Sequence, residues 1–519
     1  MLIGWVTKPA GSGGGWLRTG VVVACAVIWG AGPGFGQTAS TEGGAGAQPA
    51  VNQERAQPQA DENAAAKEVP AENGTSEKLV PGTVSSDPGT EGRKGLFSFL
   101  PDWMQIRGQA TYIIQDVPGF PAAYDGKFPS LPSRHQAEMS HSYTLFLGLK
   151  PLPWLEGYVD PEIIRGDGVN HGSGLAGEID GDVIRNPQAG KNFYGARYFG
   201  RVTVPLGGET EKMESDDHQF VGDLSVNRVS VWFGKFGSND IFDTNAYANS
   251  TRTQFMNWSF INNTAWDYAA DTRGYTVGVA MEINTKFWAL RLGSFEMPTT
   301  ANGIDLSGDW THNRGDNAEF EIRPRFFKSV EGPTKIKFLA FRNISNAGRY
   351  SDAIKLAEAT GTTPDITAVG EPATAKYGFG LNVEQPLADD GDTGLFARLG
   401  WNNDTTETYA FTEVGHEFSL GAQISGKNWG RADDRFGIAY GQNFLSNEHR
   451  EYLELGGAGF QVGDGRLDYG PEMIGETYYS ARVLSFVDLS LGYQLIFNPG
   501  YNRDRGPVSV ISFRVHLFF

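Results

Sequence analysis

The sequence predicts an all-β fold, a transmembrane antiparallel β-barrel of about 16 strands with one long loop folded inward. The first observation is that apolar and polar residues alternate in many segments, so that one strand face suits lipid and the other water. The second is that no 18-residue apolar run follows the first 36 residues, which excludes a helical membrane protein. The third is that short and long connections alternate between the predicted strands, as in bacterial outer-membrane barrels.

The N-terminus, residues 1–36, is predicted to be an export signal. Positive charge at Arg18 precedes the apolar segment TGVVVACAVIWGAG at 19–32, and small residues stand before the expected cut ahead of Gln37. The stretch VVAC, which ends at Cys25, is similar to a lipoprotein box, but Arg18 leaves too little apolar sequence before it. Cleavage would remove Cys25, the one cysteine of the chain, so no disulfide is expected.

Residues 37–94 are predicted to form a disordered periplasmic spacer, because they consist mostly of Ala, Gly, Gln, Glu and Pro with almost no aromatics. Residues 95–519 are predicted to form the barrel. The whole chain has a formal net charge of −18, and no basic patch offsets this acidic excess. The composition therefore argues against a nucleic-acid partner.

Sixteen segments of the barrel region have a period of two and are predicted as strands. They lie near 105–115, 141–150, 154–164, 193–204, 226–236, 275–284, 287–297, 317–328, 334–343, 375–385, 393–402, 414–425, 434–444, 474–482, 487–497 and 507–519. In VDLSLGYQLIF at 487–497, every second residue from Leu489 to Phe497 is apolar, and the residues between them are mostly polar or small. Apolar residues also occupy every second position back from Phe519, so the last strand is expected to turn one face to lipid.

The connections between these segments alternate in length. Short ones fall at 151–153, 285–286, 329–333, 386–392, 426–433 and 483–486, and long ones at 116–140, 165–192, 237–274, 298–316, 344–374, 403–413 and 445–473. Two connections depart from the alternation: 205–225 is long where a turn is expected, and 498–506 is short for a loop. Short turns at one rim and long loops at the other predict an outer-membrane barrel of a Gram-negative bacterium.

Two stretches carry a family resemblance. Residues 234–276 contain the blocks FDTN, TQFMNW, AWDY and DTRGY, and the last strand is preceded by NPGYNRDRGP at 498–507. In combination these blocks resemble the carbohydrate-selective porins, the OprB-like family, over about residues 105–519. The chain departs from many members at the start of the barrel, where LPDWMQIRGQATYIIQ stands in place of a Gly-Asp-Trp-Gly-Gly block. The resemblance implies a 16-stranded outer-membrane channel for monosaccharides, glucose especially.

The third long connection, 237–274, is predicted to fold inward and narrow the pore, because it is too rich in aromatics for a disordered loop. Its aromatic residues are Phe242, Tyr247, Phe255, Trp258, Trp266 and Tyr268, and its charged and amide residues are Asp243, Asn245, Arg252, Asn257, Asp267, Asp271 and Arg273. The alternative is a cap that packs its aromatics against one another, with Asp271 and Arg273 bracing each other.

Strand parity turns further charged residues toward the lumen, because a charge facing lipid costs about 2–4 kcal/mol at mid-membrane. The candidate constriction residues, from strands and loop together, are Arg107, Glu162, Arg197, Arg201, Asn257, Trp258, Trp266, Asp267, Asp271, Arg273 and Arg291. We expect the arginines on the strands to oppose Glu162 and the loop, so that the field between these walls favours neutral polyols.

The sequence also bears on other functions. A porin for organic acids or aromatic compounds is the alternative, and an outer-membrane enzyme is less favoured because G-x-S-x-G and H-E-x-x-H are both absent. Acidic and glycine residues in 166–182 are reminiscent of a calcium loop but miss the EF-hand spacing, so no metal or cofactor is expected. The expected partners are sugars and outer-membrane lipid, and both a monomer and a homotrimer are compatible with the sequence.

Overall fold

The computed structural model describes residues 99–186, 189, 192–327 and 332–519, all within one compact unit, Gly74–Phe519. The predicted export signal and spacer lie outside the described residues. Among the described residues, no helix has the length and apolar character that a membrane crossing requires.

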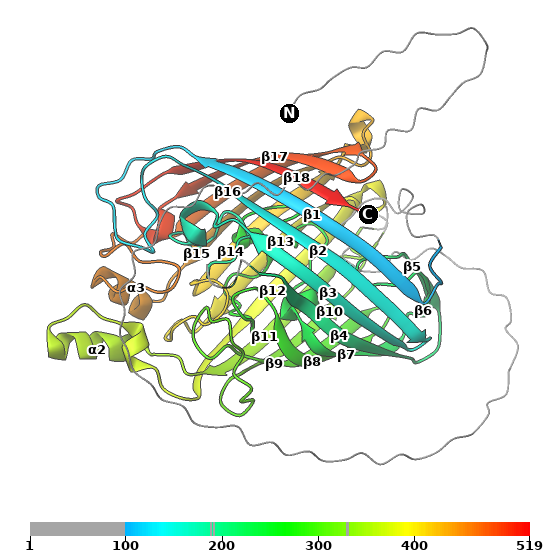
Figure 1. Ribbon diagram of the computed structural model, residues 1–519, viewed down its shortest axis with the longest axis horizontal. Coiled ribbons are helices and arrows are strands. Elements are labelled where there is room, and N and C mark those ends of the chain that lie inside the picture. Colours follow the sequence, from blue (N-terminus) through cyan, green and yellow to red (C-terminus); the bar gives the residue numbers. More distant parts are fainter. Residues whose placement is uncertain (1–98, 187–188, 190–191, 328–331) are drawn as a thin grey trace, which may run out of the picture. The chain divides into compact units, whose positions relative to one another are not determined.

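Sixteen antiparallel strands close into a single barrel, in which each strand pairs with its neighbours in sequence and β1 pairs with β18 (Figure 1). The barrel strands are β1 (Met104–Val117), β2 (Gln136–Leu152), β3 (Leu155–Arg165), β4 (Tyr194–Pro205), β7 (Arg228–Phe236), β8 (Thr276–Asn284), β9 (Trp288–Glu296), β10 (Arg314–Ile322), β11 (Lys335–Ser345), β12 (Thr374–Ala388), β13 (Thr393–Asn402), β14 (His416–Ser425), β15 (Arg435–Phe444), β16 (Glu472–Leu484), β17 (Val487–Phe497) and β18 (Val508–Phe518). The predicted all-β barrel of 16 strands is therefore confirmed.

Among the described residues, two short strands and three α-helices belong to the connections and not to the barrel wall. They are β5 (Thr210–Met213), β6 (Gly222–Ser225), α1 (Trp258–Ile261), α2 (Tyr350–Thr360) and α3 (Asn447–Glu454). Strands β5 and β6 pair with each other in the connection from β4 to β7. This hairpin occupies the connection that was unexpectedly long in the sequence, and it lies at the barrel end opposite α2 and α3 (Figure 1).

One predicted strand was displaced. The sequence predicts a strand near 317–328, whereas β10 begins at Arg314 and ends at Ile322. These bounds follow from its pairing with β9, which runs from Arg314 to Ile322. Arg323, Pro324 and Arg325 therefore lie in the turn that follows the strand and not on the barrel wall.

The C-terminal residue closes the barrel. Gln109 of β1 pairs with Phe518 of β18, and one residue further the backbones of Gly108 and Phe519 exchange hydrogen bonds in both directions, at 3.3 and 3.0 Å. A side chain on residue 108 would meet the Phe519 ring at 2.5 Å, so glycine makes room for the terminal aromatic. The apolar end of the chain thus forms one side of the seam, the β1–β18 pairing that closes the barrel wall.

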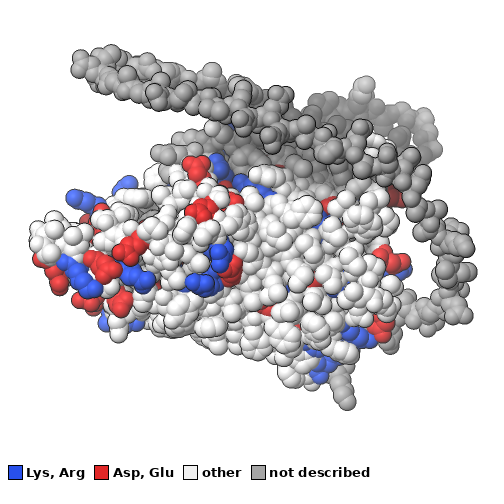
Figure 2. Space-filling view, turned by 90° about the horizontal axis from the view of Figure 1, so that it is seen from below, with Lys and Arg blue, Asp and Glu red and all other residues white. Residues whose placement is uncertain are grey.

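The outward strand face is apolar. Side chains at mid-wall positions stay exposed, for example Leu491 at 64%, Phe379 at 57% and Ile511 at 53%. The inward positions between them hold polar or charged side chains. This alternation indicates that the exposed apolar side chains face lipid. Figure 2 shows a largely uncharged wall between charged clusters that gather toward its ends.

A charge on this outward face is expected to destabilise the barrel. Leu491→Arg places a guanidinium near the middle of β17 and should lower the free energy of unfolding from lipid by about 2–4 kcal/mol. The measurement is urea-induced unfolding in phospholipid vesicles. Leu356→Arg in α2, where the side chain is 41% exposed outside the wall, serves as the control. Equal stability of the two variants would contradict a lipid-facing Leu491.

Candidate functional site

The third long loop enters the barrel lumen and packs against its wall. Phe242, Phe255 and Trp266 are fully buried. The Phe242 ring lies 6.0 Å from Phe295 of β9, and the Phe255 ring lies 5.0 Å from Tyr478 of β16. The aromatics of the loop therefore form a core shared with strands on opposite sides of the barrel, and the loop lies inside the barrel.

Carboxylates on the wall hold the loop by its backbone N–H groups. Glu476 of β16 accepts from the amides of Met256 and Asn257 at 2.7 and 3.0 Å. Two more wall residues repeat this contact at other points of the loop: Glu319 accepts from Asp243 N at 2.7 Å, and Glu384 accepts from Ala246 N at 2.9 Å. Each carboxylate replaces the water that would otherwise satisfy an irregular backbone.

Arginines on the wall hold the same loop by its carbonyls. Arg398 of β13, which is fully buried, donates to Phe260 O at 2.7 Å and to Ala248 O at 2.9 Å. It also lies 3.0 Å from the Asp243 carboxylate. Arg514 of β18 donates to two further carbonyls of the loop, those of Thr251 at 2.6 Å and Gln254 at 2.8 Å. Lumen charge is thus largely committed to positioning the loop.

The second long loop, which follows β3, also lies in the lumen. Glu472 of β16 accepts from Ala176 N and Gly177 N, and Asp182 lies 2.9 Å from Arg252 of the third loop. Burial raises the pKa of Glu178 to about 8 and that of Asp180 to about 6. Among the described residues no cluster of three or more His, Cys, Asp or Glu is arranged to hold a metal ion, and the acidic residues of this loop instead contact the barrel and the third loop.

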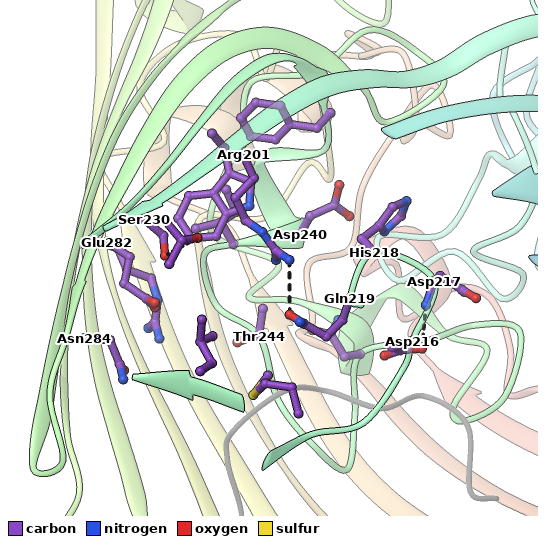
Figure 3. Close-up of a pocket in the computed structure, with 18 of the residues that line it drawn as sticks. Arg201, Asp216, Asp217, His218, Gln219, Ser230, Asp240, Thr244, Glu282 and Asn284 are labelled. Carbon is purple, nitrogen blue, oxygen red and sulfur yellow. Dashed lines mark hydrogen bonds and ion pairs between the residues drawn. The ribbon is translucent and has the colours of Figure 1, made fainter. Parts of the chain in front are cut away.

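A cavity of about 760 Å³ remains in the lumen. Its walls come from β4, β7, β8 and β9, from the third loop through Asp240 and Thr244, and from the connection between β4 and β7. Figure 3 shows Arg201, Asp240 and His218 around this space, with Glu282 and Asn284 on β8. The third loop and the connection between β4 and β7, neither of which is part of the wall, therefore narrow the open path through the barrel.

Ion pairs between neighbouring strands line the cavity. The register of β3 and β4 places Glu156 opposite Arg201 and Asp160 opposite Arg197. Arg201 Nε lies 2.8 Å from the Glu156 carboxylate. Arg197 lies 3.5 Å from Asp160 and makes a bidentate contact with Asp240 of the third loop, at 2.7 Å for each nitrogen. One arginine therefore joins the wall to the loop.

Glu162 is the centre of a buried network beside the cavity. It is fully buried and accepts from Thr144 at 2.6 Å, Tyr194 at 2.7 Å, Tyr275 at 2.8 Å and Arg252 at 3.0 Å. Four donors saturate its carboxylate oxygens. Glu162 thus fixes Arg252 and does not itself line the cavity, whereas Arg252 does.

The wall has a similar arrangement around Arg291 of β9, further along the same run of strands. Its guanidinium lies 2.8 Å from Glu282, 2.6 Å from Glu319 and 2.8 Å from Glu321. The expected separation into a basic and an acidic wall does not occur. The strand registers set Glu319 and Glu282 directly opposite Arg291, so opposite charges are neighbours within each wall.

The remaining predicted constriction residues lie behind the cavity surface. Asn257 donates to Gly177 O and to Gln494, and the Trp258 ring stacks on Phe411 at 5.0 Å. Trp266 donates to Asn317. Asp267 accepts from Tyr409 N and Ala410 N. Asp271 lies 3.3 Å from Lys235 and 3.9 Å from Arg273, whose guanidinium lies over the Tyr194 ring. Arg107 donates to Ser215 in the connection between β4 and β7. Of the eleven predicted residues, Arg197, Arg201 and Arg291 line the cavity.

Sequence reasoning missed the part of the site in the β4–β7 connection. Asp217, His218 and Gln219 line the cavity from this segment. His218 Nε2 lies 2.7 Å from Asp160, and Arg201 donates to Gln219 at 3.2 Å. The anomalous length of 205–225 was the signal that could have found them, but strand parity carries no information about a segment between strands.

The pore is expected to become more cation-selective as pH rises from about pH 5 to about pH 9. Burial and the neighbouring Asp216 raise the pKa of Asp217 to about 7. Burial opposes the charged imidazolium of His218, but Asp160 outweighs it and raises the pKa. Deprotonation makes Asp217 negative and removes the positive charge of His218, so each step makes the same side of the cavity less attractive to anions.

The measurement is the reversal potential under a salt gradient. The other charged groups facing this pair are Arg107, Asp160, Arg197, Asp216 and Asp240. The variant Asp217→Asn/His218→Gln should remove most of the pH dependence. A shift that persists undiminished in the variant would assign it to other groups.

Loss of an arginine anchor is expected to loosen the third loop. Arg398→Met keeps an unbranched side chain but leaves the buried Asp243 carboxylate without its ion-pair partner, a change that costs about 3–5 kcal/mol. The expected result is a noisier and larger single-channel conductance and an earlier urea midpoint. Arg466→Met is the control, because Arg466 is 58% exposed and pairs with Asp504 outside this loop. Identical currents in both variants would contradict the anchoring role.

Comparison with known proteins was consistent with this architecture. The profile of the carbohydrate-selective porins, OprB family, matches residues 169–519. No curated protein sequence matches the chain. The high-pH structure of Pseudomonas putida OprB is 16% identical, covers 80% of this chain and 94% of its own, and superposes with a TM-score of 0.59, which shows a shared fold.

Two further solved structures have lower scores. The low-pH structure of Pseudomonas putida OprB is 11% identical over 84% of this chain and 99% of its own, with a TM-score of 0.43. The outer-membrane channel DcaP of Acinetobacter baumannii is 10% identical over 80% of this chain and 97% of its own, also with a TM-score of 0.43. Because the family profile covers more than half of the sequence, the chain belongs to the carbohydrate-selective porin family, the OprB family, of outer-membrane channels.

Proposed function

We propose that the channel carries monosaccharides, such as glucose, passively across the outer membrane, and that the cavity is the place where it selects them. The family supplies the carbohydrate class, and the cavity supplies the chemistry. A volume of about 760 Å³ is within the range of small-molecule sites, about 300–1,000 Å³. The proposal rests on how the charges around this space are paired.

Local charge balance is the observation that carries the proposal. Nine arginines and lysines line the cavity, and eight of them have a carboxylate within 4.0 Å. A paired guanidinium still has free N–H groups, and a paired carboxylate still has free lone pairs. Such a surface exchanges hydrogen bonds with hydroxyl groups but gives an ion no strong net field. Neutral hydroxylated solutes fit it better than organic acids do.

Aromatic rings complete the lining. Phe199, Trp232 and Phe236 border the same cavity as the ion pairs. A sugar ring presents apolar C–H faces as well as hydroxyl groups, so a lining that combines rings with paired charges suits both. Weak contacts of this kind allow release as well as entry, which conduction requires.

The N-terminal predictions complete this proposal. We infer that residues 1–36 direct export and that residues 37–94 serve as a periplasmic spacer ahead of the barrel. Mass spectrometry of the protein purified from the outer membrane would test the cut, with Gln37 expected as the first residue.

Single-channel current in a planar bilayer tests the substrate. Glucose, other sugars and small carboxylates are added in turn. Saturable block by sugars at millimolar concentration supports the carbohydrate proposal. A current that sugars leave unchanged and carboxylates block would indicate that the substrates are organic acids.

Neutralising the two arginines of β4 is expected to change both ion selectivity and sugar block. Arg197→Gln/Arg201→Gln removes two positive charges beside Glu156, Asp160 and Asp240, so cation permeability should rise severalfold over anion permeability. The half-blocking glucose concentration should rise by about tenfold, which corresponds to about 1.4 kcal/mol. Arg314→Gln is the control, because Arg314 pairs with Asp316 away from the cavity. A double variant that behaves like this control would refute the assignment.

A further inference from the structure

The connection from β4 to β7 is folded up into the lumen. It spans residues 206–227, whereas the turns between β2 and β3 and between β16 and β17 take two residues each, at 153–154 and 485–486. Leu206 N donates to Asn227 O at 2.8 Å, so the two barrel strands are already joined at the base of the connection. The residues between this pair are not needed to link the strands.

The tip of the segment is fastened to the middle of the wall by His218. Its Nε2 lies 2.7 Å from Asp160 near the centre of β3. Its ring lies edge-on to three aromatic rings: Phe146 at 5.5 Å, Tyr158 at 5.4 Å and Phe199 at 5.5 Å. Strands β2, β3 and β4 thus each contribute a ring to the pocket that holds one imidazole.

The wall makes room for the neighbouring residue of the tip. Phe220 is buried, and a side chain on residue 148 would meet its ring at 3.2 Å. Glycine at this position of β2 therefore allows Phe220 to pack against the inside of the barrel. The Tyr158 ring lies 6.0 Å from Phe220 and completes the contact.

Polar contacts fix the backbone of the same segment. Arg107 of β1 donates to Ser215 O at 2.6 Å and to Ser215 Oγ at 2.7 Å. Gln105 of β1 donates to Asp217 O at 3.2 Å, and Arg201 donates to Gln219 at 3.2 Å. Arg107 is accordingly a positioning residue, since it touches the segment and not the cavity. Four adjacent strands hold this segment in place.

We propose that residues 206–227 form a second constriction element, which narrows the periplasmic half of the pore and sets the largest solute that can pass. Met213, Asp217, His218 and Gln219 border the same cavity as Arg197 and Arg201 (Figure 3). Solutes that clear the third loop then pass between this segment and the wall around Glu282 and Asn284. The inference deepens the proposed function and rests on it for the nature of the solute.

The test removes the segment and measures pore size. In the deletion variant, residues 207–226 are replaced by Asn-Gly, a two-residue turn that suits the Leu206–Asn227 pair. Polyethylene glycols of graded size report the exclusion limit from channel conductance, and liposome swelling compares disaccharide with monosaccharide entry. The expected result is a severalfold larger conductance, a larger exclusion limit and a higher ratio of disaccharide to monosaccharide entry. An unchanged limit in a variant that keeps the heat-modifiable gel mobility of a folded barrel would overturn the inference.

A second variant tests the constriction if the deletion variant does not fold. His218→Ala/Arg107→Met keeps the chain length and removes two fastening points, so the exclusion limit should rise in the same direction. His312→Ala is the matched control, because His312 contacts Asp309 in an exposed loop outside the cavity. Double-variant and control channels with the same limit would also overturn the inference.

The outcomes separate this inference from the proposed function. A larger polyethylene glycol limit in a channel that sugars neither enter nor block would sustain the second constriction and reject the carbohydrate substrate. Sugar entry with an unchanged limit would sustain the substrate and reject the second constriction.

Discussion

The structure depends on one constraint: an irregular backbone that is buried inside a barrel must find hydrogen-bond partners for its polar groups. The third loop is largely buried and has little regular secondary structure, so lumen side chains satisfy many of its N–H and C=O groups. Carboxylates such as Glu476 accept from its amides, and guanidinium groups such as Arg398 donate to its carbonyls. A lumen rich in both charges is therefore the means by which a loop is held across a pore.

The same constraint explains why charge is paired at the cavity. Antiparallel register places the lumen-facing residues of neighbouring strands directly opposite each other, as with Glu156 and Arg201. Arg197 extends such a pair to Asp240, so the third loop and the wall share one electrostatic network. The proposed selectivity for uncharged solutes then follows from the same ion pairs that fix the loop.

Strand parity predicted much of the fold because it reports local environment. The period of two identified all sixteen wall strands and turned Arg197, Arg201 and Arg291 inward, where the structure has them. Parity could not predict which inward residues meet solute, because that depends on the path of the loops through the lumen. Trp258 and Trp266 illustrate this limit: their residue type suits a sugar site, yet each packs against protein. The β4–β7 segment was visible only as an unexpected length, since its contacts join residues far apart in sequence.

The seam between β1 and β18 has a consequence for how the protein is made. Thr111 on β1 contacts His516 on β18 across a separation of 405 residues. Pairing at such distance forms late, because the entropy of closing the chain must be overcome first. Until β18 arrives, β1 is an open sheet edge able to pair with other chains. Until the C-terminal aromatic is in place, the β1 edge is therefore the part of the unfinished sheet most open to pairing with the wrong strand.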